Sequence, residues 1–164
     1  MKKLIKKILT RFYTATCLRR VKKYGQVKCN FKCTFTSKTE IGNNCHFNGM
    51  HISGNGKVVI GDNFHSGKNI RVITTFHNFD RGDALPYDDT VYSKDVIIED
   101  NVWLGESVMI LGGVRIGEGA VIQARSVVCK DVPPLAIAGG HPAVPFKYRD
   151  QAHYYALKEK GLFT

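Results

Sequence analysis

The segment Ile98–Val132, IEDNVWLGESVMILGGVRIGEGAVIQARSVVCKDV, carries an aliphatic residue at every sixth position. This first column contains Ile98, Leu104, Ile110, Ile116, Ile122 and Val128. A second column of small or β-branched residues follows it four positions later, at Val102, Val108, Val114, Ala120, Ser126 and Val132. A helix repeats every 3.6 residues and a strand every 2, so neither gives a strict period of six. The pattern predicts stacked coils, each made of three short strands joined by tight turns.

The same period occurs earlier in the chain, although less regularly. Its first column contains Cys29, Phe35, Ile41, Phe47, Ile60, Ser66 and Val72, and its second contains Cys33, Thr39, Cys45 and His51. A thiol is a small apolar group that suits a narrow interior, so we expect three of the five cysteines to be core residues. No Cys-x-x-Cys pair occurs, and the sequence therefore predicts reduced thiols without a zinc site.

Positive charge is concentrated at the start of the chain. The formal net charge is +10, but residues 1–32 hold eleven of the 24 basic residues and no acidic residue. The remaining residues have thirteen basic against fourteen acidic side chains, so the body of the protein is close to neutral. This distribution disfavours a nucleic-acid-binding function.

Residues 1–25 have the pattern of a basic amphipathic helix. Its apolar side contains Leu4, Ile5, Ile8, Leu9, Phe12 and Ala15. Residues 1–23 are compatible with peripheral contact to an anionic membrane, and equally with packing of the apolar side against the domain. Lysines interrupt the apolar run and no cleavage site follows, so we expect a cytoplasmic protein, either free or at the inner membrane face.

The hexads, NVWLG at 101–105 and SVVCKDVPPLAIAGGHPA at 126–143 resemble the hexapeptide-repeat acyltransferases. That family includes galactoside, maltose and streptogramin acetyltransferases and the O-acetyltransferases of surface polysaccharides. The resemblance covers about residues 29–149. It implies a left-handed parallel β-helix in residues 26–147, homotrimers, and acetyl-CoA bound in clefts between neighbouring chains. Residues 148–164 have helical composition and are expected to form a short capping helix.

The hexads fail between Val72 and Val96, which predicts an external loop at about residues 73–96. The loop starts within TTFHNFDRG (74–82), and its histidine occupies the place of the family's catalytic histidine. The resemblance therefore implies that His77 is the general base, a task that suits imidazole because its pKa lies near neutrality. Asp80 is a candidate partner for the other ring nitrogen, and a backbone carbonyl would serve equally.

The resemblance also suggests the other site residues. Asn48 matches an asparagine on the acceptor or oxyanion side. On the donor side the matching positions are Trp103, Ala124, Cys129, Lys130 and Lys147. The carboxylate pair of galactoside-type enzymes is missing at Asn55–Gly56, so the acceptor stays open. The histidines lack a paired ligand motif, and no metal is expected to be required.

Together these features predict an acetyl-CoA-dependent O-acetyltransferase that acts on a sugar hydroxyl, and we expect it to work in surface polysaccharide or glycan synthesis. Acetylation of an amino sugar or an antibiotic is the alternative within the same chemistry. A non-catalytic β-helix scaffold is the alternative from another class, and it would not need His77, Asn48 and Trp103 in one cleft.

Overall fold

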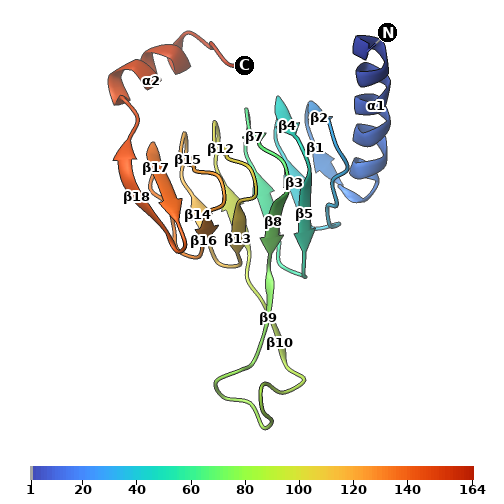
Figure 1. Ribbon diagram of the computed structural model, residues 1–164, viewed down its shortest axis with the longest axis vertical. Helices are drawn as coiled ribbons and strands as arrows, with labels where there is room; N and C mark the ends of the chain where they lie inside the picture. Colours follow the sequence, from blue (N-terminus) through green and yellow to red (C-terminus); the bar gives the residue numbers. More distant parts are fainter. Residues whose placement is uncertain (1) are drawn as a thin grey trace.

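Each coil of the chain contributes one short strand to each of three sheets, here named faces A, B and C (Figure 1). The computed structural model describes residues 2–164, without the side chain of Lys2. Face A contains β1 (Lys23–Tyr24), β3 (Thr39–Ile41), β6 (Val58–Ile60), β11 (Val96–Ile98) and β14 (Arg115–Ile116). Face B contains β2 (Val27–Cys29), β4 (Cys45–Phe47), β7 (His65–Ser66), β12 (Trp103–Leu104), β15 (Val121–Ile122), β17 (Ala136–Gly140) and β18 (Ala143–Tyr148). Face C contains β5 (Met50–Ser53), β8 (Ile70–Ile73), β13 (Met109–Leu111) and β16 (Val127–Val128).

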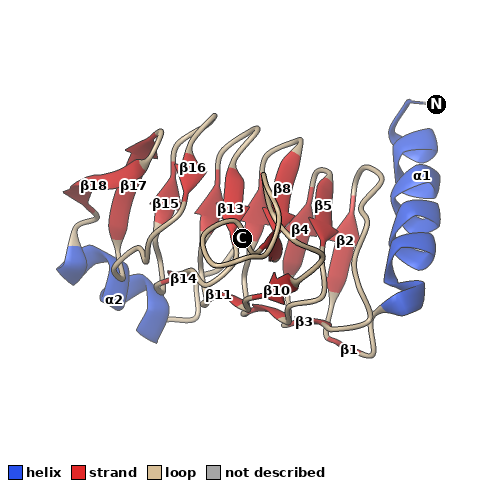
Figure 2. Ribbon diagram, turned by 90° about the horizontal axis from the view of Figure 1, so that it is seen from below, coloured by secondary structure: helices blue, strands red, loops and turns tan. Residues whose placement is uncertain are grey.

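The strands pair in parallel from coil to coil, except that β18 turns back antiparallel on β17. The architecture is a left-handed parallel β-helix, as the resemblance to the family implied. Figure 2 shows the coils stacked side by side, with one helix at each end of the row.

Both columns of the segment Ile98–Val132 lie inside the β-helix, where every member is at most 3% exposed. Each buried aliphatic side chain of this size contributes about 1.5–3 kcal/mol relative to exposure. Cys29, Cys33 and Cys45 are also buried, so the interior position expected for them is confirmed.

The expected interior position of His51 is wrong. Its neighbours Met50 and Ile52 are buried, while His51 is exposed on β5. Phe47 and Ile52 occupy equivalent core positions of β4 and β5 but are only five residues apart, because the corner between these strands is one residue shorter than a hexad. Since side chains alternate between the faces of a strand, this single-residue change turns His51 outward.

Stacked asparagines shape the corner between faces A and B. Asn44, Asn63 and Asn101 adopt left-handed backbone angles, with φ of 52°, 54° and 60°. Their side chains form a ladder in which Asn44 donates to Asn63 at 3.0 Å and Asn63 donates to Asn101 at 2.9 Å. Asparagine tolerates this conformation better than most residues, which explains its use at the corner.

A hairpin interrupts the coils between β8 and β11. Its stem is β9 (Thr75–His77) paired antiparallel with β10 (Val91–Ser93), and it projects far from the β-helix (Figure 1). The hairpin leaves the corner between faces C and A. The side chain of Thr74 anchors its base, because its hydroxyl accepts a hydrogen bond from the amide of Gly56 at 3.1 Å.

The N-terminal end of the stack is covered by α1 (Lys2–Cys17) and a short 3₁₀ helix, η1 (Leu18–Arg20). The hydroxyl of Thr14 accepts a hydrogen bond from the amide of Cys29, and the hydroxyl of Thr10 donates to Asn30. These threonines and Cys17 lie on the opposite side of the helix from Ile8 and Phe12. The apolar side of α1 therefore faces away from the β-helix.

The other end of the chain forms α2 (Gln151–Glu159), where Asp150 caps the first turn by accepting from the amide of His153. Among residues 2–164, no helix has both the length and the apolar character needed to cross a bilayer.

Candidate active site

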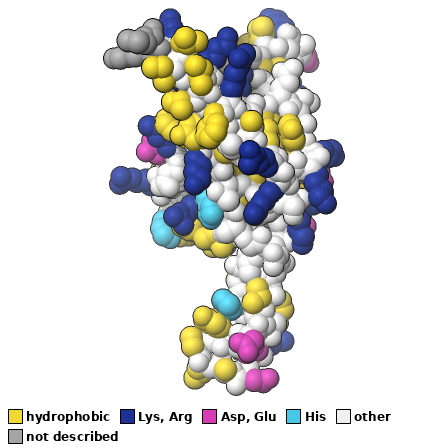
Figure 3. Space-filling view, turned by 90° about the vertical axis from the view of Figure 1, so that its right-hand side faces the viewer, with side chains coloured by type: hydrophobic (Ala, Val, Ile, Leu, Met, Phe, Trp, Pro, Cys, Tyr) yellow, Lys and Arg dark blue, Asp and Glu magenta, His cyan; other side chains and the backbone are white. Residues whose placement is uncertain are grey.

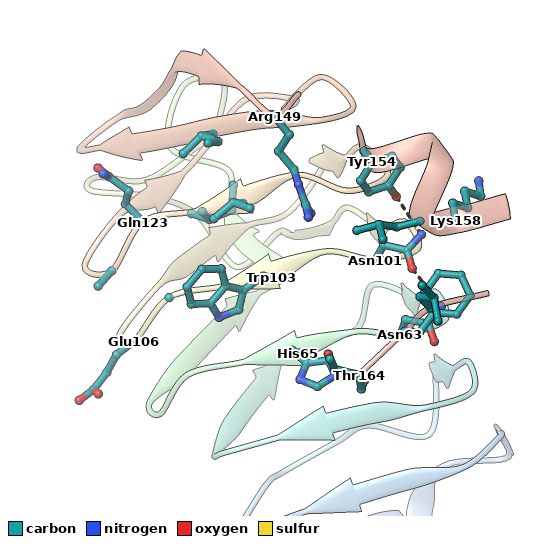
Figure 4. Close-up of a pocket in the computed structure, with 18 residues that line it drawn as sticks. Asn63, His65, Asn101, Trp103, Glu106, Gln123, Arg149, Tyr154, Lys158 and Thr164 are labelled. Carbon is teal, nitrogen blue, oxygen red and sulfur yellow. Dashed lines mark hydrogen bonds between the residues drawn. The ribbon is translucent and has the colours of Figure 1, made fainter. Parts of the chain in front are cut away.

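A groove of about 1060 Å³ lies on face B beneath α2 (Figure 4). Strands β12 and β15 form its floor, and Trp103 projects from that floor with 56% of its surface exposed. The backbone of Ala124 forms part of the wall beside Gly105. A Cβ at Gly105 would come within 2.5 Å of the amide nitrogen of Ala124, so glycine lets the two coils approach closely here.

A hydrogen-bonded cluster closes one end of the groove. Tyr154 donates to Glu118 at 2.8 Å and accepts from Asn101 at 2.9 Å, and Lys158 donates to Glu118 at 2.6 Å. Partial burial would raise the pKa of Glu118, but the hydrogen bonds from Lys158 and Tyr154 outweigh it and lower that pKa. Burial and the hydrogen bond to Glu118 raise the pKa of Tyr154. The guanidinium of Arg149 lies 4.9 Å from the centre of the Tyr154 ring.

The wall of the groove thus combines an exposed indole with cationic side chains. Arg149 and Lys158 supply positive charge, and Gln123 supplies an amide (Figure 4). A long ligand with an apolar arm and anionic groups would find partners for both parts here.

Two histidines continue the row of Trp103 along face B. His46, His65 and Trp103 stand in register on successive strands. The imidazole rings of His46 and His65 are 4.5 Å apart, and Nε2 of His65 donates to the carbonyl of Thr164 at 2.8 Å. Burial, and then the positive charge of His65 and Lys28, lowers the pKa of His46.

His77 lies at the end of β9 on the hairpin, with an exposed side chain. Its ring stacks on Tyr87, with ring centres 4.0 Å apart and an angle of 18° between the planes. The neighbouring Asn78 donates to Asp88 at 3.0 Å, which ties together the two sides of the hairpin. A hydrogen bond from the amide of Thr90 lowers the pKa of the Asp88 carboxyl.

Asp80 is exposed on the same loop, and no hydrogen bond joins it to His77 in the part of the chain that the structure describes. Tyr87 takes the place next to the imidazole. The sequence offered no periodic signal for this contact, because it depends on how an irregular loop folds back.

Asn48 lies at the corner between faces B and C. Its side-chain amide donates a hydrogen bond to the carbonyl of Ser66 at 2.7 Å, and its side-chain oxygen accepts one from Asn30 at 3.0 Å. Ala124 occupies the same corner farther along the stack. Cys129 and Lys130 are exposed after β16, at the corner from which the hairpin leaves, and Lys147 is exposed on β18.

Within one chain, the groove brings together Trp103 and Ala124. His77 and Asp80 lie on the hairpin, and Asn48, Cys129, Lys130 and Lys147 do not line the groove. The expected residues are therefore divided between two edges of the β-helix, separated by face C. The sequence reasoning missed Arg149, Tyr154 and Lys158, whose positions depend on the turn from β18 into α2.

Known proteins resemble this chain in both sequence and structure. Residues 95–130 match the family described as bacterial transferase hexapeptide (six repeats). The chain is 34% identical over 128 residues to galactoside O-acetyltransferase of Escherichia coli strain K12, with 77% of this chain and 62% of that enzyme covered. The chain spans 53% to 62% of the length of the first curated relatives that it matches.

The solved structures cover more of the chain. A hexapeptide-repeat containing acetyltransferase from Vibrio cholerae is 30% identical with a TM-score of 0.73, covering 86% of this chain and 82% of that one. Its complex with acetyl-CoA is 28% identical with a TM-score of 0.61, covering 77% and 66%. A maltose O-acetyltransferase from Clostridium difficile 630 is 28% identical with a TM-score of 0.68, covering 90% and 86%. With its buried hexads, its hairpin and its exposed Trp103, the chain belongs to the hexapeptide-repeat acetyltransferases.

Proposed function

We propose that the protein transfers the acetyl group of acetyl-CoA to a sugar hydroxyl, with His77 as the general base. The observation that carries this proposal is an exposed histidine, held by Tyr87 on the one hairpin that interrupts the described coils of an acetyltransferase fold. The relatives named as galactoside and maltose O-acetyltransferases support a sugar hydroxyl as acceptor.

In this reaction neutral His77 takes the proton of the acceptor hydroxyl as its oxygen attacks the thioester carbonyl. The tetrahedral intermediate then collapses, the carbon–sulfur bond breaks, and the imidazolium returns the proton to the leaving thiolate of CoA. The products are the acetyl ester and free CoA, and no acyl-enzyme forms. Asn48 has one amide hydrogen beyond the one bonded to Ser66, and it is our candidate donor to the oxyanion.

The groove on face B is the proposed place for the donor. Trp103 would contact the pantetheine arm, and the backbone of Ala124 would meet its amides. CoA carries several phosphate charges, so Lys130, Lys147 and Arg149 are the cations that we expect to bind them. Cys129, beside Lys130, is a further proposed contact on the donor side. Stacking on Tyr87 orients the imidazole of His77 in this proposal, and Asp80 lies on the same loop.

The division of the site between two edges supports a homotrimer. In a closed ring the hairpin edge of one chain meets the Trp103 edge of its neighbour, so each site takes residues from two chains. Phe79 and Tyr92 on the hairpin are apolar and exposed, and they are suited to that contact.

We further propose that α1 lies on the inner face of a membrane, where the enzyme meets saccharides destined for the cell surface. Leu4, Ile5, Ile8, Leu9 and Phe12 are all exposed on its outer side. Where α1 meets the first coil, a groove of about 850 Å³ is lined by Lys3, Lys6, Lys7, Arg11, Arg19 and Lys28. Figure 3 shows apolar and cationic side chains together on this end of the molecule. Cations near an anionic surface contribute about 1 kcal/mol each.

Vesicle binding tests the membrane proposal. The protein should sediment with phosphatidylglycerol vesicles, and not with phosphatidylcholine vesicles, in a salt-dependent way. Replacing Ile8 and Phe12 by serine should abolish sedimentation, whereas Leu85→Ser in the hairpin should leave it unchanged. The opposite result is that the native chain fails to bind anionic vesicles while the α1 variant forms a smaller oligomer. That result would make the helix a contact between copies of the chain.

The release of free CoA from acetyl-CoA tests the reaction itself. We expect release with one member of a panel of mono- and oligosaccharides, and a loss of about 10²–10⁴-fold in His77→Ala. His51→Ala, on an exposed strand position, is the matched control and should keep full activity. Panel members with amino groups separate ester from amide formation. Full activity in His77→Ala would remove the proposed base, and absence of CoA binding would favour a scaffold.

A further inference from the structure

The fold brings three thiols together where the N-terminal helix meets the first coil. Cys17 ends α1, Cys29 ends β2, and Cys33 lies in the following turn. Their sulfur atoms all lie within 4.8 Å of one another, and the three side chains are at most 9% exposed. The hexad pattern accounts for Cys29 and Cys33 as core residues, but it does not account for a third thiol from the helix.

The spacing of the sulfur atoms is suited to a metal ion. A metal–sulfur bond of about 2.3 Å in a tetrahedral or trigonal site separates the sulfurs by about 3.8–4.0 Å. The three thiols therefore need only a small inward shift to share one ion. Cys29 and Cys33 are separated by three residues, within the spacing common in structural zinc sites.

Backbone amides point at the sulfur atoms of the cluster. The amide of Cys33 donates to Sγ of Cys17 at 3.1 Å, and the amide of Met50 donates to Sγ of Cys33 at 3.4 Å. Amide donors of this kind stabilise a thiolate, which is the form of cysteine that binds a metal.

The surrounding charge also favours an anionic metal–thiolate centre. Residues 1–32 contain eleven cations and no acidic residue, and Arg19, Arg20 and Lys32 are near the three cysteines in sequence. Among the residues that the structure describes, these three cysteines are the one group of metal-ligating side chains brought together in this way.

We propose that Cys17, Cys29 and Cys33 form a structural site for a soft, thiol-binding metal ion, Cu⁺ or Zn²⁺. Thiolate ligands select these ions over harder cations. Three sulfurs complete a trigonal site for Cu⁺, whereas Zn²⁺ would take a fourth, non-protein ligand. On binding, each thiol that is still protonated releases its proton to solvent, and no electron is transferred.

The ion would join α1 to the β-helix and take no part in acetyl transfer. One ligand comes from the helix and two from the first coil, so the metal–sulfur bonds would cross the contact to which Thr10 and Thr14 contribute hydrogen bonds. The free energy of metal binding would then stabilise the packing of α1 on the first coil.

Metal titration of the full-length protein tests the site. All variants carry Cys129→Ser, which removes the one exposed thiol among the five cysteines. Protein prepared under reducing, anaerobic conditions is stripped with a chelator, then titrated with Cu⁺ or Zn²⁺ against a competing chromogenic chelator. The readouts are bound metal per chain by elemental analysis, proton release, and the shift in Tm.

Cys17→Ala is the decisive variant, and Cys45→Ala is its matched control. Cys45 is buried in the same β-helix, and burial raises its pKa to about 11, but it lies outside the cluster. We expect one ion per chain and a higher Tm on metal addition in the parent and in Cys45→Ala, and neither in Cys17→Ala. Cys17 lies at the margin of the core, so this test stands even if Cys29→Ala fails to fold.

Three results would overturn the proposal. The first is that the parent binds no ion at stoichiometric concentration, and the second is that Cys17→Ala binds metal as well as the parent does. The third is a disulfide between two of the three cysteines in protein kept reduced, detected by mass spectrometry after alkylation.

Discussion

The stacked coils and the hairpin are stabilised in different ways. In the coils, each inward side chain touches its equivalents in the coils on either side, and the columns from Ile98 to Val132 are almost wholly buried. In the hairpin, residues such as Phe79 and Leu85 remain exposed, and the stem is a single antiparallel pair. The coils therefore provide most of the stability of the molecule. The hairpin contributes little to stability, so its residues can serve catalysis instead.

Removing a core side chain from a coil should give the largest effect. Leu104 is fully buried in β12, and Leu104→Ala should lower the free energy of unfolding by about 2–5 kcal/mol. The matched change in the hairpin is Leu85→Ala, where the side chain is 95% exposed and the expected change is within about 0.5 kcal/mol. Chemical denaturation measures both, and equal losses would mean that the hairpin is part of the core.

Removing the ring beside His77 should affect activity and leave stability unchanged. Tyr87→Leu takes away the stacked partner of the imidazole, and we expect kcat to fall about tenfold or more as the imidazole loses its position. Tyr87→Phe keeps the stack and should restore most of the rate. If both variants lose activity equally, the hydroxyl of Tyr87 matters and the stacking does not.

The packing of α2 on the β-helix should respond weakly to the loss of one hydroxyl. Tyr154→Phe removes the hydrogen bonds to Glu118 and Asn101, at a cost of about 1 kcal/mol. Tyr155→Phe is the control, because Tyr155 is 41% exposed. Thermal unfolding compares the two variants. An unchanged Tm in Tyr154→Phe would show that the hydrogen-bonded cluster does not stabilise the packing of α2.

The smallest expected effect is a loss of stability at acid pH in the packing of α2. The pKa of Glu118 is lower in the folded state than its unfolded value of about 4.3. Its contribution to stability is therefore fully present above that value and is lost as the pH falls through the folded pKa. Glu118→Gln should flatten this part of the stability profile between neutral and acid pH. A profile identical to that of the native chain would exclude Glu118 as a source of the acid sensitivity.

The same contrast explains what the sequence could predict. The two columns from Ile98 onward predict the fold because every coil repeats the same packing. Six repeats of one pattern therefore all indicate the same structure. The prediction fails at His51, where one corner lacks a residue and the phase changes. It also misses Tyr154 as the buried anchor of α2, since Tyr155 and Leu157 fit the helical pattern equally well.

Contacts between distant segments were beyond the reach of the sequence. The stacking of His77 on Tyr87 depends on the path of an irregular loop. The meeting of Cys17 with Cys29 depends on which side of α1 packs on β2, and the threonines rather than the larger apolar residues form that side. The resemblance to a family supplied Trp103 and Ala124 in the groove, but the arrangement of Arg149 and Lys158 follows from the turn that leads into α2.

The position of α1 also bears on how copies of the protein can assemble. β2 is the terminal strand of face B, and a bare terminal strand can pair with another chain and start a fibre. Because α1 packs on β2, the longest strand of the first coil is closed to growth along the stack. A second chain therefore cannot extend face B beyond β2.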